Sequence, residues 1–230
     1  MAARIRFPPA AAALVVAAAA MVTISPAKPA TAVGVPPATA VAGVPPAPVV
    51  PPSALLPAEA VPGPPADRTV FDVATALSTA DRSDGTGCAD VVHGRVLHPG
   101  TGAGQGFQTA VPGGQLSELV ARTPHPTDLA AWTAQARRCA RVTVDDRDLS
   151  TVSTTTLGTG PAVPGAQTLS YQQVLTLPGQ PAGLPGLRLR TVAIAADGVL
   201  VLLRDAGATD LDLDTLAVAA WQHAVARLGR

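Results

Sequence analysis

The stretch from residue 129 to residue 144 changes its hydrophobic period within one segment. The apolar residues of its first part share one helical stripe: Leu129, Trp132, Ala136 and Cys139. Thr127 or Asp128 precedes this stripe as the N-cap of a helix. After the helix, Val142 and Val144 alternate with polar residues, which is the period of a strand. We therefore expect a helix that lies on a sheet and leads directly into one of its strands.

Four later segments have the composition or the alternation of β-strands. They are residues 151–157, 168–177, 187–196 and 199–204. The dipeptide Asp197-Gly198 joins the last two, and it suits a type I′ turn because both central residues of that turn need a positive φ. Residues 210–230 follow as an amphipathic helix with acidic residues in its first turns.

Residues 67–122 have less regular patterns. Their apolar spacing predicts helices at 67–82 and 115–122, strands at 89–97 and 107–111, and a glycine-rich loop at 98–106. The glycine spacing in this loop matches neither a dinucleotide-binding fingerprint nor a P-loop. Together with the later elements, these patterns predict an α+β fold in which helices pack on an antiparallel sheet of about five or six strands.

The first 66 residues have the patterns of an export signal and a tether. Arg4 and Arg6 precede an apolar run of about 15 residues, too short for a typical membrane span, and a small-residue cleavage site ends at Ala32. Residues 1–32 are therefore predicted to be a signal peptide, with retention as an N-terminal anchor left open. Residues 33–66 are rich in proline and are expected to form a disordered linker that builds no core. The folded domain is then 67–230.

The charge of the predicted mature chain bears on its partners. The whole chain has 16 basic and 16 acidic residues, and loss of Arg4, Arg6 and Lys28 with the leader would leave a net charge of −3. A nucleic-acid partner requires a basic patch, so we do not expect one. If the leader is cleaved, the chain has no stable membrane anchor, and we expect a secreted or extracytoplasmic protein of the cell envelope.

Two cysteines, Cys88 and Cys139, occur in the chain. In an exported domain such a pair is most simply a structural disulfide. The alternatives are two free thiols or a metal site with His93 and His98, whose spacing is not a standard zinc pattern. The disulfide would tie the first predicted strand to the helix that begins near residue 129.

Residues 67–230 contain no catalytic motif of the common hydrolase classes, and no enzyme activity or cofactor is predicted. The four histidines are scattered and are expected to have structural or surface roles: His93, His98, His125 and His223. Two acidic groups, at 145–148 and 210–214, do not complete a calcium-binding loop. Trp132 and Trp221 each lie on an apolar helix face and are the candidate cleft residues, with core packing as the alternative role.

The order of these features resembles the sensor-domain-containing proteins of the actinobacterial envelope. The resemblance rests on Cys88, the segment from Trp132 to Cys139, the later strands, and the final hairpin and helix. These proteins are similar to the extracellular sensor domain of a group of transmembrane Ser/Thr kinases, which implies an antiparallel sheet with a ligand-binding cleft. This chain has one cysteine pair where the kinase-linked domain has two, and it contains no kinase domain.

The sequence therefore predicts a secreted, non-enzymatic sensor or binding domain for an unknown envelope ligand. A structural or adaptor protein that binds a protein partner is the alternative, and an unrecognised hydrolase is the third hypothesis. A large apolar pocket containing Trp132 or Trp221 would favour the first. A flat surface with an accessible edge strand would favour the second, and a buried histidine beside serine and aspartate the third.

Overall fold

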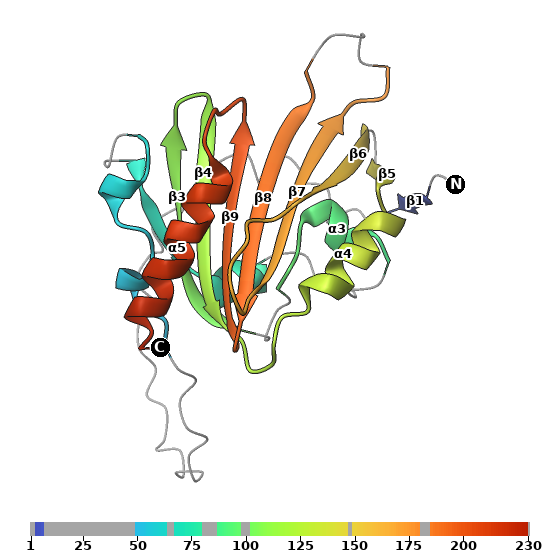
Figure 1. Cartoon of the computed structure of the whole chain (residues 1–230). Helices are drawn as coiled ribbons and strands as arrows, with labels where there is room; N and C mark the ends of the chain where they lie inside the picture. The colour runs from blue at the N-terminus through green and yellow to red at the C-terminus, as the bar shows by residue number, and fades with distance from the viewer. Residues whose placement is uncertain are drawn as a thin grey trace, which may run out of the picture.

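The computed structural model describes residues 3–6, 49–63, 67–79, 87–97, 102–146, 149–179 and 185–229. In this part of the chain one sheet has the strand order β1-β5-β6-β7-β8-β9-β4-β3-β2 (Figure 1). The strands are β1 (Ala3–Arg6), β2 (Thr69–Asp72), β3 (Ala103–Val111), β4 (Gly114–Arg122), β5 (Arg141–Asp146), β6 (Leu149–Gly158), β7 (Gln167–Thr176), β8 (Leu187–Ala196) and β9 (Val199–Gly207). The helices are α2 (Val73–Thr79), α3 (Ala89–His93), α4 (Leu129–Arg138) and α5 (Leu213–Arg227), and two short 3-10 helices are η1 (Pro52–Ala54) and η2 (Ala58–Ala60).

The sheet is larger than the sequence predicted. Strands β2 to β9 form eight antiparallel strands, so the prediction of about five or six is wrong. β1 pairs with β5 in parallel and extends the sheet by one strand. Residues 7–48 lie outside the described part of the chain, so cleavage of the predicted leader stays a prediction.

The extra strands come from residues 69–122, where two predictions are wrong. The segment 115–122, predicted as a helix, is strand β4, and the loop predicted at 98–106 contains the first half of β3. Pro112 and Gly113 form the tight turn between them, and Gly113 has a φ of +82°. One buried face of β4 carries Leu116, Glu118 and Val120. Because Glu118 is charged, these positions do not form the apolar alternation by which a strand is predicted.

The first predicted helix is wrong in part, and the first predicted strand is wrong. Residues 69–72 are the edge strand β2, and the helix α2 begins only at Val73, with the Asp72 carboxylate accepting a hydrogen bond from the Thr75 N–H at 2.8 Å. Residues 89–93, predicted as strand, form the short helix α3. This helix ends at Gly94, whose left-handed φ of +61° is typical of a glycine C-cap.

The C-terminal half follows its predictions closely. Asp128 is the N-cap of α4 and accepts a hydrogen bond from the Ala131 N–H at 2.8 Å. The predicted hairpin is β8–β9, and its turn residues Asp197 and Gly198 have φ values of +48° and +73°. Helix α5 is the predicted terminal helix, and its first turn is capped by Asp212.

The two faces of the sheet form two separate cores. On one face, α5 packs on β8 and β9, and the buried strand residues there include Val192, Ile194 and Leu203. On the other face, α3 and α4 pack on the sheet with buried residues that include Leu169 and Ala193. Because side chains of a strand alternate between faces, neighbouring positions of β8 serve different cores.

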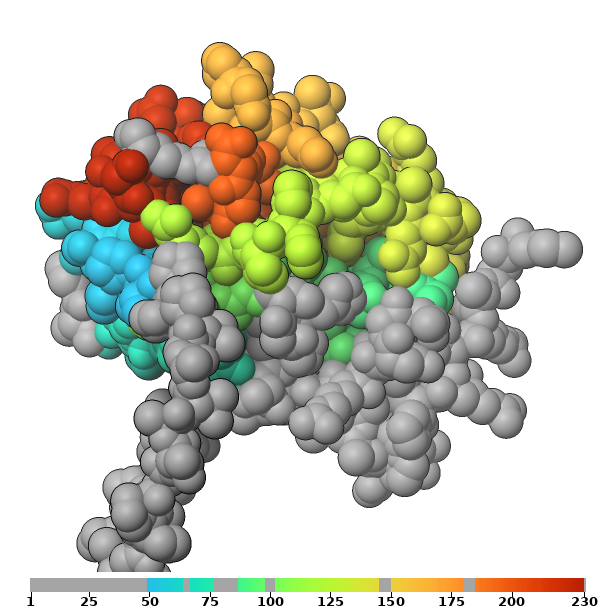
Figure 2. All heavy atoms as spheres, turned by 90° about the horizontal axis from the view of Figure 1, so that it is seen from below, coloured from blue at the N-terminus to red at the C-terminus, as the bar shows by residue number. Residues whose placement is uncertain are grey.

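Residues 49–63 form a strap along the first of these cores. Figure 2 shows the light-blue residues of this strap lying against the red end of α5. The buried residues of the strap are Val50, Ala54, Leu55, Leu56 and Val61. The expectation that residues 33–66 build no core is therefore wrong for the strap. Its prolines favour an extended backbone with short 3-10 turns, and the apolar residues between them still fill the core.

Candidate functional site

A disulfide between Cys88 and Cys139 joins the two helices on the second face of the sheet. Cys88 is the residue before α3, Cys139 is the residue after α4, and their Cα atoms are 5.4 Å apart. The predicted pairing is present. A side-chain hydrogen bond from Gln135 to the Gly87 carbonyl lies beside it and links the same two segments. Both helices are thus held in a fixed relation to each other.

Helix α3 is also fixed to the sheet beneath it. The buried Gln173 side chain on β7 donates a hydrogen bond to the Val91 carbonyl at 2.7 Å. Arg204 on β9 donates to the Gly94 carbonyl at 2.9 Å and to the Tyr171 hydroxyl at 3.1 Å. These charged and polar contacts satisfy the carbonyls at the end of a helix too short to be stable alone.

Trp132 on α4 is held in one orientation. Its indole N–H donates a hydrogen bond to the Arg95 carbonyl at 2.8 Å. Its ring lies 4.5 Å from the Tyr171 ring, centroid to centroid, at an interplanar angle of 32°. The side chain is 7% exposed. Hydrogen bonding and ring contact together fix the tryptophan as a rigid wall.

Beside Trp132 lies a cavity of about 500 Å³, which we call the tryptophan pocket. It opens between α4, the segment that follows α3, and the connection from β4 to α4. Its lining residues are Asp90, Val96, Leu97, Thr123, Pro124, His125, Pro126, Thr127, Asp128, Ala131, Trp132 and Gln135. Half of these residues carry polar side chains and half are apolar. Such a mixture can both bind and orient a small molecule, and the volume falls in the usual range of small-molecule sites, roughly 300 to 1,000 Å³.

The other candidate cleft residue, Trp221, lies elsewhere. It is 8% exposed and belongs to the core beneath α5, on the opposite face of the sheet from Trp132. The structure therefore does not bring the two tryptophans together, and only Trp132 lines the tryptophan pocket. The connection 123–127 supplies five of the lining residues, and its sequence signals were its prolines and the candidate N-cap Thr127, neither of which indicates a pocket.

The remaining titratable candidates are dispersed. His125 lines the tryptophan pocket, His223 has its Nε2 2.9 Å from the Ser53 carbonyl oxygen, and His98 lies outside the described residues. Within the described ranges, no three histidine, cysteine, aspartate or glutamate side chains are grouped as a metal site would require. The same residues include no helix long and apolar enough to span a bilayer.

No family model matches the chain, and no curated protein matches it. Among solved structures, an uncharacterized protein of Mycobacterium smegmatis, the Rv0999 ortholog, is similar at 16% identity over 72% of this chain and 90% of its own, with a TM-score of 0.46. The resemblance to envelope sensor domains stays a prediction from the sequence.

Proposed function

We propose that this chain is a non-enzymatic binding domain that acts outside the cytoplasm and takes an apolar small molecule into the tryptophan pocket. One observation supports this most directly: a cavity of about 500 Å³ is walled by a tryptophan that a hydrogen bond and a ring contact hold in place. A rigid wall loses little side-chain entropy when a ligand binds, so more of the interaction energy contributes to affinity.

The lining of the tryptophan pocket indicates the chemistry of its ligand. Val96, Leu97 and Trp132 offer apolar surface, and Pro124 and Pro126 add rigid apolar groups at the rim. The polar side chains are distributed around this surface and can orient one polar end of a ligand. The ligand class is therefore a largely apolar molecule with a small polar head.

The disulfide supports a site of action outside the cytoplasm. Disulfides persist in oxidising compartments and are rare where thiols are kept reduced. In this fold the bond joins α3 and α4, both of which line the tryptophan pocket through Asp90, Ala131, Trp132 and Gln135. The disulfide thus joins the two helices that line the pocket.

Filling part of the pocket should weaken binding. Ala131 lines the pocket, whereas its neighbour Ala130 does not, and both are exposed on α4. With N-phenyl-1-naphthylamine as a neutral apolar probe, we expect Ala131→Leu to weaken binding at least about tenfold, equivalent to roughly 1.4 kcal/mol. Ala130→Leu is the matched control and should bind as the wild type does. Equal affinity of the two variants would rule out the tryptophan pocket as the binding site.

The chain's two tryptophans allow the site to be located directly. In a Trp221→Phe protein the remaining indole is Trp132, and the probe should quench its fluorescence by energy transfer. In a Trp132→Phe protein the remaining indole lies across the sheet, and its quenching per bound probe should be weaker, with the amount bound measured from the emission of the probe itself. Native mass spectrometry of protein isolated from its own export route would then identify the bound molecule. Co-purification of a protein in place of a small molecule would favour the adaptor hypothesis.

A further inference from the structure

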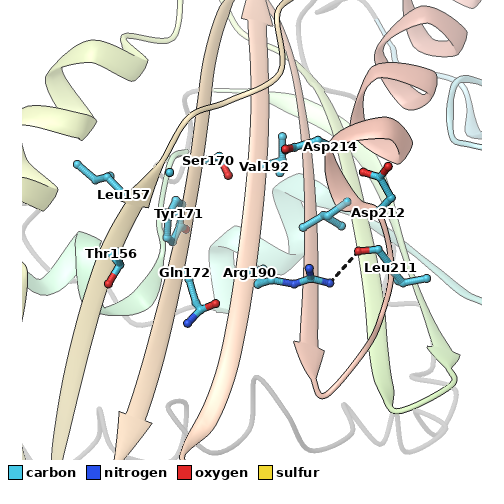
Figure 3. Close-up of a pocket in the computed structure, with 12 residues that line it drawn as sticks. Thr156, Leu157, Ser170, Tyr171, Gln172, Arg190, Val192, Leu211, Asp212 and Asp214 are labelled. Carbon is cyan, nitrogen blue, oxygen red and sulfur yellow. Dashed lines mark hydrogen bonds between the residues drawn. The ribbon is translucent and has the colours of Figure 1, made fainter.

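A second cavity, of about 360 Å³, lies on the face of the sheet that carries α5 (Figure 3). We call it the sheet cleft. Its lining residues are Thr156, Leu157, Gly158, Ser170, Tyr171, Gln172, Arg190, Val192, Leu211, Asp212, Leu213 and Asp214. The strands supply its floor, and the start of α5 with the residues before it supplies one wall.

The sheet cleft exists because α5 covers only part of this face. Helix α5 packs on β8 and β9, and the same face of β6 and β7 carries hydroxyl and amide side chains at Thr156, Ser170 and Gln172. On the opposite face of these two strands, Tyr171 and Thr155 are buried. One side of β6 and β7 is thus packed into a core, while the other presents polar groups beside the wall made by α5.

Three of the floor side chains stand in one row across the sheet. Thr156 pairs with Gln172, Gln172 pairs with Arg190, and Arg190 pairs with Asp205. Neighbouring strands are about 4.8 Å apart, so this row presents a hydroxyl, an amide and a guanidinium at regular intervals. Among the residues drawn in Figure 3, the single hydrogen bond joins Arg190 to Leu211, so the groups of Thr156, Ser170 and Gln172 do not bond to one another.

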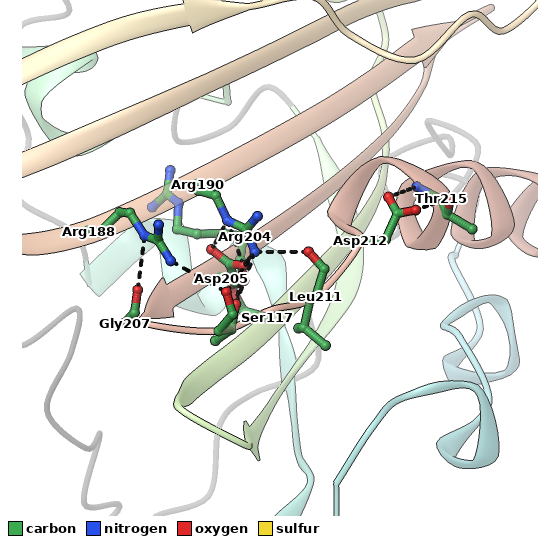
Figure 4. Close-up of polar contacts among 10 residues, drawn as sticks. Ser117, Arg188, Arg190, Arg204, Asp205, Gly207, Leu211, Asp212 and Thr215 are labelled. Atoms are coloured by element: carbon green, nitrogen blue, oxygen red, sulfur yellow. Dashed lines mark hydrogen bonds and ion pairs between the residues drawn. The ribbon is translucent and has the colours of Figure 1, made fainter.

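Arg190 is fixed at the end of this row (Figure 4). Its guanidinium pairs with both carboxylate oxygens of Asp205, which is 1% exposed, and it donates to the Thr209 hydroxyl and the Leu211 carbonyl, each at 3.0 Å. The hydrogen bond with Asp205 raises the pKa of Arg190. The ion pair neutralises the arginine charge within the sheet, and the hydrogen bonds to Thr209 and Leu211 join the segment before α5 to β8.

The wall of the sheet cleft adds one hydrogen-bond acceptor for a ligand, the carboxylate of Asp214. Asp212 is engaged as the cap of α5, accepting from the Thr215 N–H at 3.1 Å and the Thr215 hydroxyl at 2.7 Å, and these bonds lower its pKa. The pKa of Asp214 is raised, first by desolvation and then by the charge of Asp212. Asp214 therefore gains from a hydrogen-bond donor brought next to it by a ligand.

We infer that the sheet cleft is a second binding site, for a neutral, hydroxyl-rich small molecule of saccharide or cyclitol type. Each ligand hydroxyl can donate and accept, and so can the Thr156 and Ser170 hydroxyls and the Gln172 amide. A strongly anionic ligand would meet Asp212 and Asp214, and the arginine charge that could attract it is already neutralised by Asp205. The site is independent of the tryptophan pocket, which lies on the other face.

The test is an NMR titration of the whole chain with glucose, galactose, mannose and myo-inositol. We expect saturable shifts of the backbone amides of β6 and β7 and of the Gln172 side-chain amide with at least one of these probes. Thr156→Val and Gln172→Leu should each weaken that binding at least about fivefold. Thr154→Val is the matched control, because Thr154 lies on the same strand and face but outside the cleft, and it should leave binding unchanged.

Binding at the sheet cleft and binding at the tryptophan pocket respond to different variants. Ala131→Leu, which fills the tryptophan pocket, should leave the polyol shifts intact, and Thr156→Val should leave binding of the apolar probe intact. The inference is overturned if no probe gives saturable shifts up to its solubility limit, or if Thr156→Val and Thr154→Val behave alike. Shifts produced by sodium sulfate but by none of the polyols would also overturn it.

Discussion

Replacing both cysteines by serine should lower the free energy of unfolding by roughly 4 kcal/mol, because the bond between Cys88 and Cys139 closes a loop across a sequence separation of 51 residues. The crosslink restricts the unfolded chain, and its loss raises the entropy of that state. For a domain of this size the melting temperature should fall by roughly 10 °C. Chemical denaturation of the wild type and of Cys88→Ser/Cys139→Ser measures the difference.

The same substitution should affect the tryptophan pocket more than the sheet cleft. The disulfide joins α3 and α4 at the tryptophan pocket, whereas the sheet cleft is built from β6, β7, β8 and α5. Reductant should therefore weaken apolar-probe binding by the wild type and have no effect on the double variant. If the oxidised and reduced wild type unfold at the same denaturant concentration, the stabilising role assigned to the bond is wrong.

The sequence predicted best those elements whose signals are local. The Asp197-Gly198 dipeptide needs only its own φ angles to specify a hairpin, and both residues adopt the positive values expected. Asp128 and the apolar stripe that ends at Cys139 define α4 without reference to the rest of the fold. The cysteine pairing followed from there being two cysteines in a chain with a predicted export signal.

The predictions failed where a residue's role depends on distant partners. Glu118 is a core residue of β4 because its carboxylate accepts a hydrogen bond from the Leu56 N–H, 62 positions away in sequence. No hydrophobic pattern assigns a glutamate to a core, so the strand was predicted as a helix. The prediction that residues 33–66 build no core failed at the strap for the same reason. The apolar residues of the strap are buried by α5, which lies at the other end of the chain.

The lining of the two cavities also depends on residues that no local sequence pattern brings together. Trp132 was recognised from its helical stripe, but the connection 123–127 that completes its pocket has no periodicity to interpret. The row Thr156, Gln172 and Arg190 is created by the register of three strands. A shift of one residue in any pairing would send these side chains to the opposite face, so the row could not be read from the sequence.

Glu118 is expected to make the stability of this protein strongly dependent on pH. Its side chain is 1% exposed, its Oε2 accepts the Leu56 N–H at 2.9 Å, and its Oε1 has no hydrogen-bond partner among the described residues. Desolvation raises the pKa of this carboxyl from 4.5 to about 7, and the hydrogen bond from Leu56 and the charge of Arg68 oppose the shift only in part. Burial thus favours the protonated acid.

The sign of the effect follows from the direction of this shift. The folded state binds the proton of Glu118 more tightly than the unfolded state, so the contribution to stability is complete below the unfolded pKa of 4.5 and is lost as pH rises through about 7. Between about pH 4 and pH 8 this group alone should remove about 3 kcal/mol from the free energy of unfolding.

Glu118→Gln tests this directly, because glutamine stays neutral and its amide oxygen can still accept the Leu56 N–H. Subtracting the pH profile of the variant from that of the wild type cancels the other titrating groups, and the difference should have the size and sign given above. Glu59→Gln is the matched control, since Glu59 is exposed on the same strap and near Arg68, and it should alter the profile little. A wild-type profile parallel to that of Glu118→Gln would mean that water reaches this carboxylate.

Hydrogen exchange at the Leu56 amide should also be faster in the wild type at about pH 8 than in the Glu118→Gln variant, because ionised Glu118 favours opening of the strap toward solvent.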